Sequence, residues 1–260
     1  MGNLVTAYTP TELAALQSVG TFSSTLSLVA CIVTLHRIWG DAKVGSLSLA
    51  TKIVAVLLSI NFFYAMATIT GYAGSRNATF CTFNGFGIQA FGLATQFWMT
   101  VMAWIMYRWI VKKKHPQRLE RLIPKSLLTC LTLAFADALI VLSFKMYGPT
   151  DTWCWISEQH TNARFYSFYI MLVLAWVWCI VLMIWIRAFQ QFRSEGQFDH
   201  PGANAHSTVN AGYDVVERSI KNKLTSYIGL YVFCWAFPLI NRSAEAFLRK
   251  NWYPTSLMQV

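Results

Sequence analysis

Two of the six cysteines are placed where a disulfide bond could form. Cys81 lies directly before the third apolar run, and Cys154 lies between Trp153 and Trp155 in the polar stretch GPTDTWCWISEQHTNARF, residues 148–165. If both face an oxidising compartment we expect them to be bridged, with two unpaired thiols as the alternative. A bridge would hold the stretch against the third apolar run and let the two tryptophans pack as a lid. The other cysteines lie within apolar runs, where a thiol acts as a small hydrophobic group: Cys31, Cys130, Cys179 and Cys234.

Two residues inside apolar runs are candidates for a switch or a hinge. A charged carboxylate at a bilayer centre costs roughly 2.5–3.5 kcal/mol, so Asp137 should face the interior of a helix bundle. It is either a protonated or hydrogen-bonded structural residue, or a switch or ion site. Pro238, which follows Trp235 in the sequence FCWAFP, removes a backbone hydrogen bond and should kink its helix. The kink is either a hinge or a static bend.

Composition shows which elements must position these residues. Hydrophobic residues make up 55% of the 260 residues and charged residues only 12%, which is about half the charged share of a typical soluble protein. Such a chain needs a bilayer. Six apolar runs are long enough to cross a hydrocarbon core of about 30 Å as helices. They cover residues 13–36, 49–73, 84–111, 126–146, 166–189 and 224–248.

The distribution of positive charge predicts the orientation. With the N-terminus outside, most of the 21 Lys and Arg residues fall in inner connections, as the positive-inside rule favours. This asymmetry accounts for the net charge of +10, so no nucleic-acid partner is expected. The sequon Asn77-Ala78-Thr79 would then lie outside, where Asn77 could be glycosylated.

The expected fold is an all-α membrane protein, a seven-transmembrane-helix receptor bundle in which helix 7 is truncated and six spans are complete. Residues 1–12 form an extracellular tail, residues 13–260 the bundle, and residues 190–217 a flexible inner loop. A seventh helix would start at YPTSLMQV, the last residues of the sequence. No catalytic or metal-binding constellation and no phosphate-binding loop is recognised, so no cofactor is expected and the chain is not interpreted as an enzyme.

Several segments together resemble a known receptor family. Cys81 is followed closely by FNGFGIQAFGLATQFWMTVMAW, TWCWI precedes the fifth run, and FCWAFPLINR lies in the sixth. This combination resembles the cyclic-AMP-receptor-like (class E) G-protein-coupled receptors, and it is more distantly similar to secretin/adhesion receptors. The rhodopsin-like acidic-Arg-Tyr triplet is absent at MYRWIVKKK, so that switch is not transferred to this chain.

The resemblance implies a plasma-membrane receptor that senses a small extracellular ligand, such as a cyclic nucleotide, and activates a heterotrimeric G protein. For an anionic ligand, the expected cations are Arg164 and Arg242. The side-chain amides of Asn84 and Gln89 could contact the ligand; alternatively, they hydrogen-bond to neighbouring helices inside the bundle. The expected ligand contacts are Asn84, Gln89, Trp155, Arg164, Tyr166, Tyr169, Arg242 and Glu245.

The inner ends of the third and sixth runs are expected to contact the G protein. The alternative is that their charges only set topology and attract anionic membrane lipid. The residues concerned are Arg108, Lys112, Lys113, Lys221 and Lys223. Two alternatives to the signalling receptor remain: a small transporter or channel, and a truncated non-signalling receptor that dimerises with or traps an intact one. A homodimer is a further expected assembly.

Overall fold

The computed structural model describes residues 9–45, 47–73, 77–150 and 153–196, together with residues 226, 229, 230 and 233. Most of the predicted sixth span, the start of helix 7 and most of the predicted 190–217 loop lie outside these residues. So do Lys221, Lys223, Trp235, Pro238, Arg242 and Glu245.

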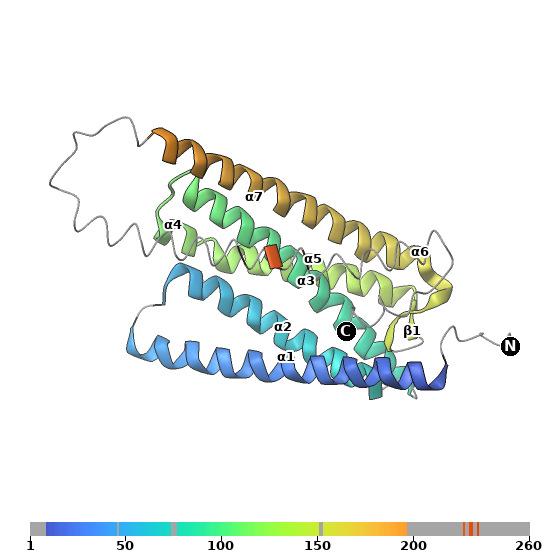
Figure 1. Ribbon diagram of the computed structural model, residues 1–260. Coiled ribbons are helices and arrows are strands. Elements are labelled where there is room, and N and C mark those ends of the chain that lie inside the picture. Colours follow the sequence, from blue (N-terminus) through green and yellow to red (C-terminus); the bar gives the residue numbers. More distant parts are fainter. Residues whose placement is uncertain are drawn as a thin grey trace.

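Long helices arranged side by side make up the described part of the chain (Figure 1). They are α1 (Pro10–Val44), α2 (Leu49–Ala73), α3 (Ala78–Ile110), α5 (Ile123–Ser143) and α7 (Ile170–Gly196). The short helix α4 (Pro116–Glu120) connects α3 to α5. A two-stranded antiparallel hairpin, β1 (Tyr147–Pro149) and β2 (Cys154–Ile156), follows α5 and was not expected from the sequence. The 3-10 turn η2 (Glu158–His160), helix α6 (Thr161–Arg164) and the π-helical turn η3 (Phe165–Tyr169) then lead into α7.

Helix boundaries follow local capping signals. Helix α1 begins at Pro10, three residues before the predicted span, because Thr9 and Glu12 form a reciprocal capping box and proline suits the first helical position. The same bonds lower the pKa of Glu12, mainly through the backbone N–H of Thr9. Helix α2 has the predicted bounds. Helix α7 continues to Gly196, so the predicted loop start at residue 190 is wrong.

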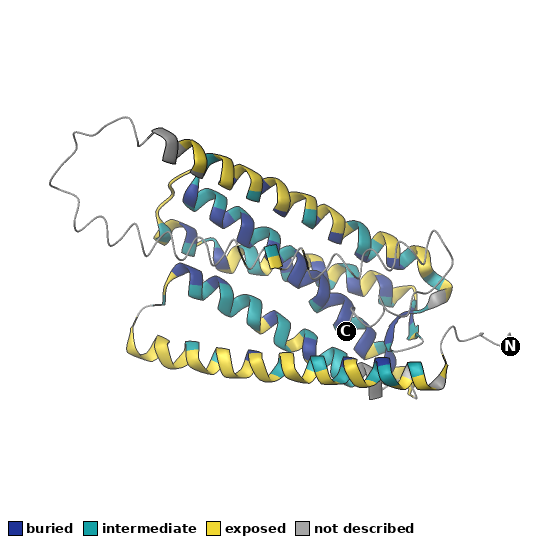
Figure 2. Cartoon of the chain, in the orientation of Figure 1, coloured by how far each residue is buried: buried dark blue, intermediate teal, exposed yellow. Residues whose placement is uncertain are grey.

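Helix α3 lies at the centre of the described helices. It contacts α2, α5 and α7, whereas α1 packs on α2 (Figure 2 shows the burial along α3). Its interior includes the fully buried amides of Gln89 and Gln96 and the indole of Trp98, which donates to the carbonyl oxygen of Ile53 at 3.1 Å. The core of this bundle therefore forms around α3, and α1 and α7 turn broad exposed apolar faces outward.

Four of the described helical segments are long and apolar enough to cross a membrane: Ala14–Val44, Leu49–Thr70, Pro116–Ser143 and Thr161–Phe189. Helix α3 is also long enough to cross, because its 33 residues extend about 50 Å. Its mean hydropathy, however, is lower than that of these four segments. Neighbouring helices cover much of its surface, so the polar groups on it face protein rather than lipid. The chain is a multi-pass membrane protein.

Candidate functional site

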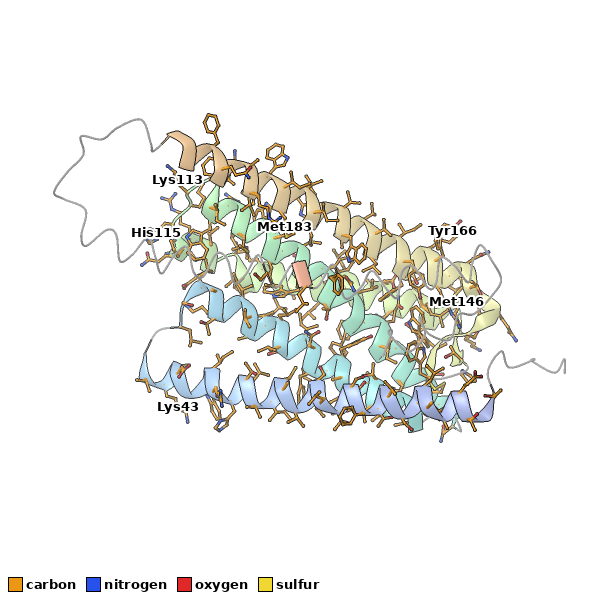
Figure 3. The ribbon with its side chains drawn as sticks, viewed as in Figure 1. Lys43, Lys113, His115, Met146, Tyr166 and Met183 are labelled. Carbon is orange, nitrogen blue, oxygen red and sulfur yellow. A yellow bond between two sulfur atoms is a disulfide. The ribbon has the colours of Figure 1, made fainter. Side chains whose placement is uncertain are left out.

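A disulfide ties the β hairpin to the first turn of α3. Cys81 and Cys154 are bridged, with Cα atoms 5.1 Å apart, and both are buried. The predicted disulfide is confirmed, and the alternative of two unpaired thiols is wrong. We call this end of the bundle the disulfide end. Met146 and Tyr166, labelled in Figure 3, mark it, while Lys43, Lys113 and His115 mark the opposite end.

The hairpin packs directly on α3. Gly148 pairs with Trp155 and Pro149 with Cys154 in its register. A Cβ atom on Gly85 of α3 would lie 2.9 Å from Cδ1 of Tyr147 and 3.3 Å from Cα of Trp155. Only glycine permits so close an approach. The tryptophan-rich stretch thus forms a lid held down by a disulfide, as the sequence suggested, and Trp155 is 5% exposed.

A buried amide connects this lid to three helices. The Nε1–H of Trp155 donates to Oε1 of Gln89 at 2.9 Å. Nε2 of Gln89 donates to Oδ2 of Asp137 on α5 at 2.7 Å and to Oγ of Ser167 in η3 at 3.3 Å. We call these four residues the Gln89 cluster. Both ends of the amide are therefore hydrogen-bonded, and the cluster links β2, α3, α5 and η3.

The only acidic side chain within α5 lies in this cluster. Asp137 faces the bundle interior and is half-buried, as a membrane-embedded carboxylate should be. Its hydrogen bond to Gln89 agrees with the structural interpretation, while its role as a switch stays a prediction. The phenol of Tyr147 donates to the carbonyl oxygen of Ala138 on the next residue of α5, at 3.1 Å.

The buried cation Arg164 contacts the lid. Its Nε–H donates to the carbonyl oxygen of Ile156 at 2.7 Å, and its guanidinium lies 5.7 Å from the ring centroid of Trp155. The rings of Phe168 and Tyr169 meet Trp155 edge-on, with centroids 5.4 and 6.1 Å away. A positive charge and an aromatic wall therefore adjoin the polar Gln89 cluster.

Four of the predicted ligand contacts meet at this place: Gln89, Trp155, Arg164 and Tyr169. Asn84 is also buried, on the same helix as Gln89 but closer to its N-terminus. Its Oδ1 accepts a 2.9 Å hydrogen bond from the hydroxyl of Thr70 on α2. Tyr166 is 66% exposed on the outer surface of the disulfide end and does not join them (Figure 3). The sequence analysis missed Tyr147 and Ser167, since neither carries a charge or belongs to a recognisable spacing.

Asn77 caps α3 at the disulfide end. Its Oδ1 accepts from the backbone N–H groups of Thr79 and Phe80, at 3.0 and 3.2 Å, and the residue is exposed. The amide nitrogen that would carry a glycan takes no part in the cap. Glycosylation there stays a prediction.

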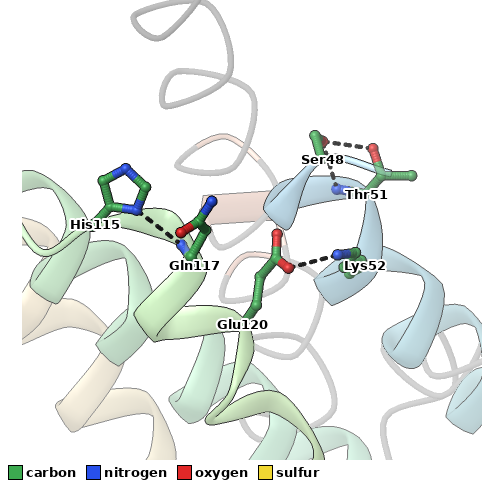
Figure 4. Close-up of polar contacts among 6 residues, drawn as sticks. All are labelled: Ser48, Thr51, Lys52, His115, Gln117 and Glu120. Atoms are coloured by element: carbon green, nitrogen blue, oxygen red, sulfur yellow. Dashed lines mark hydrogen bonds and ion pairs between the residues drawn. The ribbon is translucent and has the colours of Figure 1, made fainter. Parts of the chain in front are cut away.

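The opposite end of the bundle is strongly basic. A surface hollow of about 510 Å³ is lined by Lys112, Lys113, Lys114, His115, Gln117 and Arg118. Glu120 points away from it toward α2, where it forms a 2.6 Å ion pair with Lys52 (Figure 4). The guanidinium of Arg108 lies 4.9 Å from the ring centroid of Trp104. Of the predicted coupling residues, Arg108, Lys112 and Lys113 thus gather at one end.

Among the described residues, no three His, Cys, Asp or Glu side chains come together as metal ligands.

Comparisons with known proteins place these features in a family. The slime mold cyclic AMP receptor family matches residues 8–259. Cyclic AMP receptor 4 of Dictyostelium discoideum is 26% identical over 174 residues, which are 63% of this chain and 33% of that protein. Cyclic AMP receptor 2 of the same organism is 23% identical over 250 residues, 88% of this chain and 57% of that protein. Cyclic AMP receptor 1 is 23% identical over 240 residues, 91% of this chain and 56% of that protein.

The chain therefore spans little more than half, or less, of the length of these relatives. No relative named here is a secretin or adhesion receptor, and that more distant similarity stays a prediction. The family consists of receptors rather than enzymes. Because the family match covers nearly all of the sequence and agrees with the helical membrane bundle, the chain belongs to the slime mold cyclic AMP receptor family.

Proposed function

We propose that the chain is a G-protein-coupled receptor that senses a small extracellular ligand at the disulfide end and activates a heterotrimeric G protein at the basic end. The names of its relatives support a cyclic nucleotide as the ligand class. The observation that carries the proposal is the Gln89 cluster, which connects a disulfide-tethered lid to α3, α5 and η3.

Two independent rules support an orientation with the disulfide end, and so the N-terminus, outside. Disulfides form in oxidising compartments, and Cys81–Cys154 lies at one end. Positive charges concentrate on the cytoplasmic side, and the sequence from Arg108 to Lys125 contributes seven of them at the other end.

The chemistry under the lid suits a cyclic nucleotide. Its phosphodiester carries one negative charge, which the guanidinium of Arg164 would attract, and its base is a flat ring that stacks on aromatic side chains such as Trp155 and Tyr169. Asn84 and Gln89 supply amides for the polar edges of the base. Tyr166, Arg242 and Glu245 remain proposed contacts from the surrounding surface.

Signalling then requires that the ligand favour one arrangement of the helices over another. A ligand that displaced Trp155 would break its hydrogen bond to Gln89 and leave that amide to re-form bonds with Asp137 and Ser167. Such a change biases the relative positions of α3, α5 and α7. Asp137 acts as the switch in this proposal, and Trp235 and Pro238 supply the hinge.

The opposite ends of these helices would meet the G protein. Arg108 and Lys112 stack over aromatic rings of α3, which fixes where their charges lie. With Lys113, Lys221 and Lys223 they form the proposed coupling surface. If these residues dock the G protein, the positions of the charges matter. If they only set the membrane topology, the number of charges near the helix end is sufficient.

A guanine-nucleotide exchange assay tests the proposal. The purified protein in nanodiscs is combined with a heterotrimeric G protein and titrated with cyclic AMP, cyclic GMP and AMP. We expect a cyclic nucleotide to accelerate exchange. Arg164→Gln should raise the half-maximal concentration at least tenfold while Arg164→Lys, which keeps the charge, retains part of the response.

A second pair of variants separates coupling from ligand binding. Arg108→Gln/Lys112→Gln should reduce maximal exchange with unchanged ligand affinity. Lys43→Gln/Arg187→Gln removes equal charge from exposed positions that are not among the proposed coupling residues and should leave exchange intact. Failure of all three nucleotides to bind or to stimulate exchange would refute the proposed ligand class.

A further inference from the structure

The basic hollow contains only groups that can donate hydrogen bonds to an anion. Three lysines, one arginine, one histidine and one glutamine line it, and no acidic residue does. Glu120, the nearest acid in the sequence, is held by Lys52 of α2 (Figure 4). The lining charges are therefore not neutralised from within this segment of the chain.

The backbone holds these side chains around one space. Lys113 adopts a left-handed conformation with φ of 48°, which is costly for a residue other than glycine. The N–H of Lys114 donates to the carbonyl oxygen of Arg108 at 3.1 Å and closes the turn after α3. Nδ1 of His115 accepts from the N–H of Gln117, which leaves Nε2–H as a further donor.

Aromatic residues mark the depth of this hollow relative to a bilayer. Three cations near this end stack over aromatic rings: Lys43 over Trp39, Arg108 over Trp104 and Lys112 over Tyr107, at 4.4, 4.9 and 6.0 Å from the centroids. Aromatic rings with neighbouring cations occur at the level of the lipid headgroups. The hollow begins directly after this level, where α3 ends at Ile110.

We propose that the hollow lined by Lys112–His115, Gln117 and Arg118 binds the phosphomonoester headgroup of an anionic membrane lipid of the phosphoinositide class. A phosphomonoester presents several acceptor oxygens and up to two negative charges, which match a concave set of donors better than the single charge of a phosphodiester lipid. The proposal rests on the proposed orientation of the chain and does not depend on G-protein activation.

Lipid binding can be measured without a G protein by native mass spectrometry of the detergent-solubilised protein. The probes are short-chain phosphatidylinositol bisphosphate, short-chain phosphatidylserine and soluble inositol trisphosphate. The test variant is Lys114→Gln/Arg118→Gln, which leaves the proposed coupling residues unchanged. The matched control is Lys43→Gln/Arg187→Gln, which removes the same charge from exposed positions that do not line the hollow.

We expect the bisphosphate lipid to bind at one saturable site and the test variant to weaken it roughly 30-fold, because each near-surface cation contributes about a fivefold factor. The control should change affinity less than threefold. Equal losses in both variants, or no loss in either, would overturn the proposal. Equal binding of phosphatidylserine would show that the hollow attracts anionic lipids in general, and it would overturn the proposed selectivity for a phosphomonoester headgroup. Equally tight binding of inositol trisphosphate would make the ligand a free anion rather than a lipid.

The outcome is separable from the proposed function. Lost lipid binding in Lys114→Gln/Arg118→Gln with normal nucleotide-stimulated exchange would support the lipid site as a distinct element. Absence of stimulated exchange in the unmodified protein, with selective lipid binding retained, would count against the receptor proposal alone.

Discussion

The indole N–H of Trp155 and the side-chain oxygen of Gln89 are joined by a 2.9 Å hydrogen bond across 66 residues of sequence. The bond is buried, so water cannot replace either partner. It places an element of the lid in direct contact with the central helix.

We predict that Trp155→Phe lowers the free energy of unfolding by about 1–3 kcal/mol, because it leaves a buried acceptor on Gln89 without its donor. Thermal unfolding in detergent measures the change. Trp178→Phe is the control, since Trp178 lies on the exposed face of α7, and it should have little effect. Comparable losses in the two variants would show that the indole N–H of Trp155 contributes nothing.

Gly85→Ala should loosen the lid, whereas Gly40→Ala should stabilise α1. The new methyl at position 85 meets Tyr147 and the backbone of Trp155, at a cost of about 1–3 kcal/mol for overpacking. Nothing lies within 4 Å of a Cβ at Gly40, and alanine there gains up to about 1 kcal/mol in helix propensity. Melting temperatures that shifted in the same direction would contradict this prediction.

Lys145→Gly should stabilise the protein by about 0.5–1 kcal/mol. Lys145 follows the end of α5 and has a φ of 54°. Its backbone N–H donates to the carbonyl oxygen of Leu142, and the N–H of Met146 donates to the carbonyl oxygen of Val141. These two bonds form the pattern of a Schellman motif. Glycine adopts this conformation without the steric cost that lysine bears. Lys145→Ala retains that cost, and an equal gain for alanine in thermal unfolding would refute the explanation.

Alkaline pH should destabilise the lid through Tyr147. Burial raises the pKa of this phenol above its ordinary value of 10.0, and the negative charge of Asp137 adds to the effect. The neutral phenol therefore contributes stability that is fully present below the unfolded pKa and is lost as the pH rises above it, because the unfolded state then loses its proton first.

Unfolding measured from neutral pH to about pH 11 checks this. The stability difference between the wild type and Tyr147→Phe should narrow at the alkaline end. Tyr166→Phe removes an exposed hydroxyl and should keep the pH dependence of the wild type. A difference for Tyr147→Phe that stayed constant across this range would be inconsistent with a buried phenol.

The sequence predicted the features with a strong physical cost. Asp137 had to face the interior because a bilayer penalises a carboxylate, and Cys81 and Cys154 were the cysteines outside the apolar runs. The hairpin was missed because strands of three residues are too short to show an alternating pattern. The residues between the two strands, 150–153, also have a composition typical of a loop.

The separation of Tyr166 from Tyr169 has a geometric cause. Residues spaced as Tyr166 and Tyr169 share a face in an α-helix, and both were expected to point toward the ligand. They lie instead in the π-helical turn Phe165–Tyr169, whose wider turn separates them around the axis. The ring of Tyr169 contacts Trp155, while Tyr166 is exposed. The sequence contains no pattern from which this π-helical turn could be predicted.

The modest hydropathy of α3 bears on how the protein is made. A translocon releases each segment into lipid according to its own hydrophobicity, and the buried amides that make α3 a good central helix make it a weak insertion signal. In the proposed orientation, the lysines after Ile110 would keep its far end on the cytosolic side, and α2 and α5, which are more apolar, would flank it in the bilayer. We therefore expect α3 to insert together with its neighbours, so that its buried amides meet their protein partners before they meet lipid.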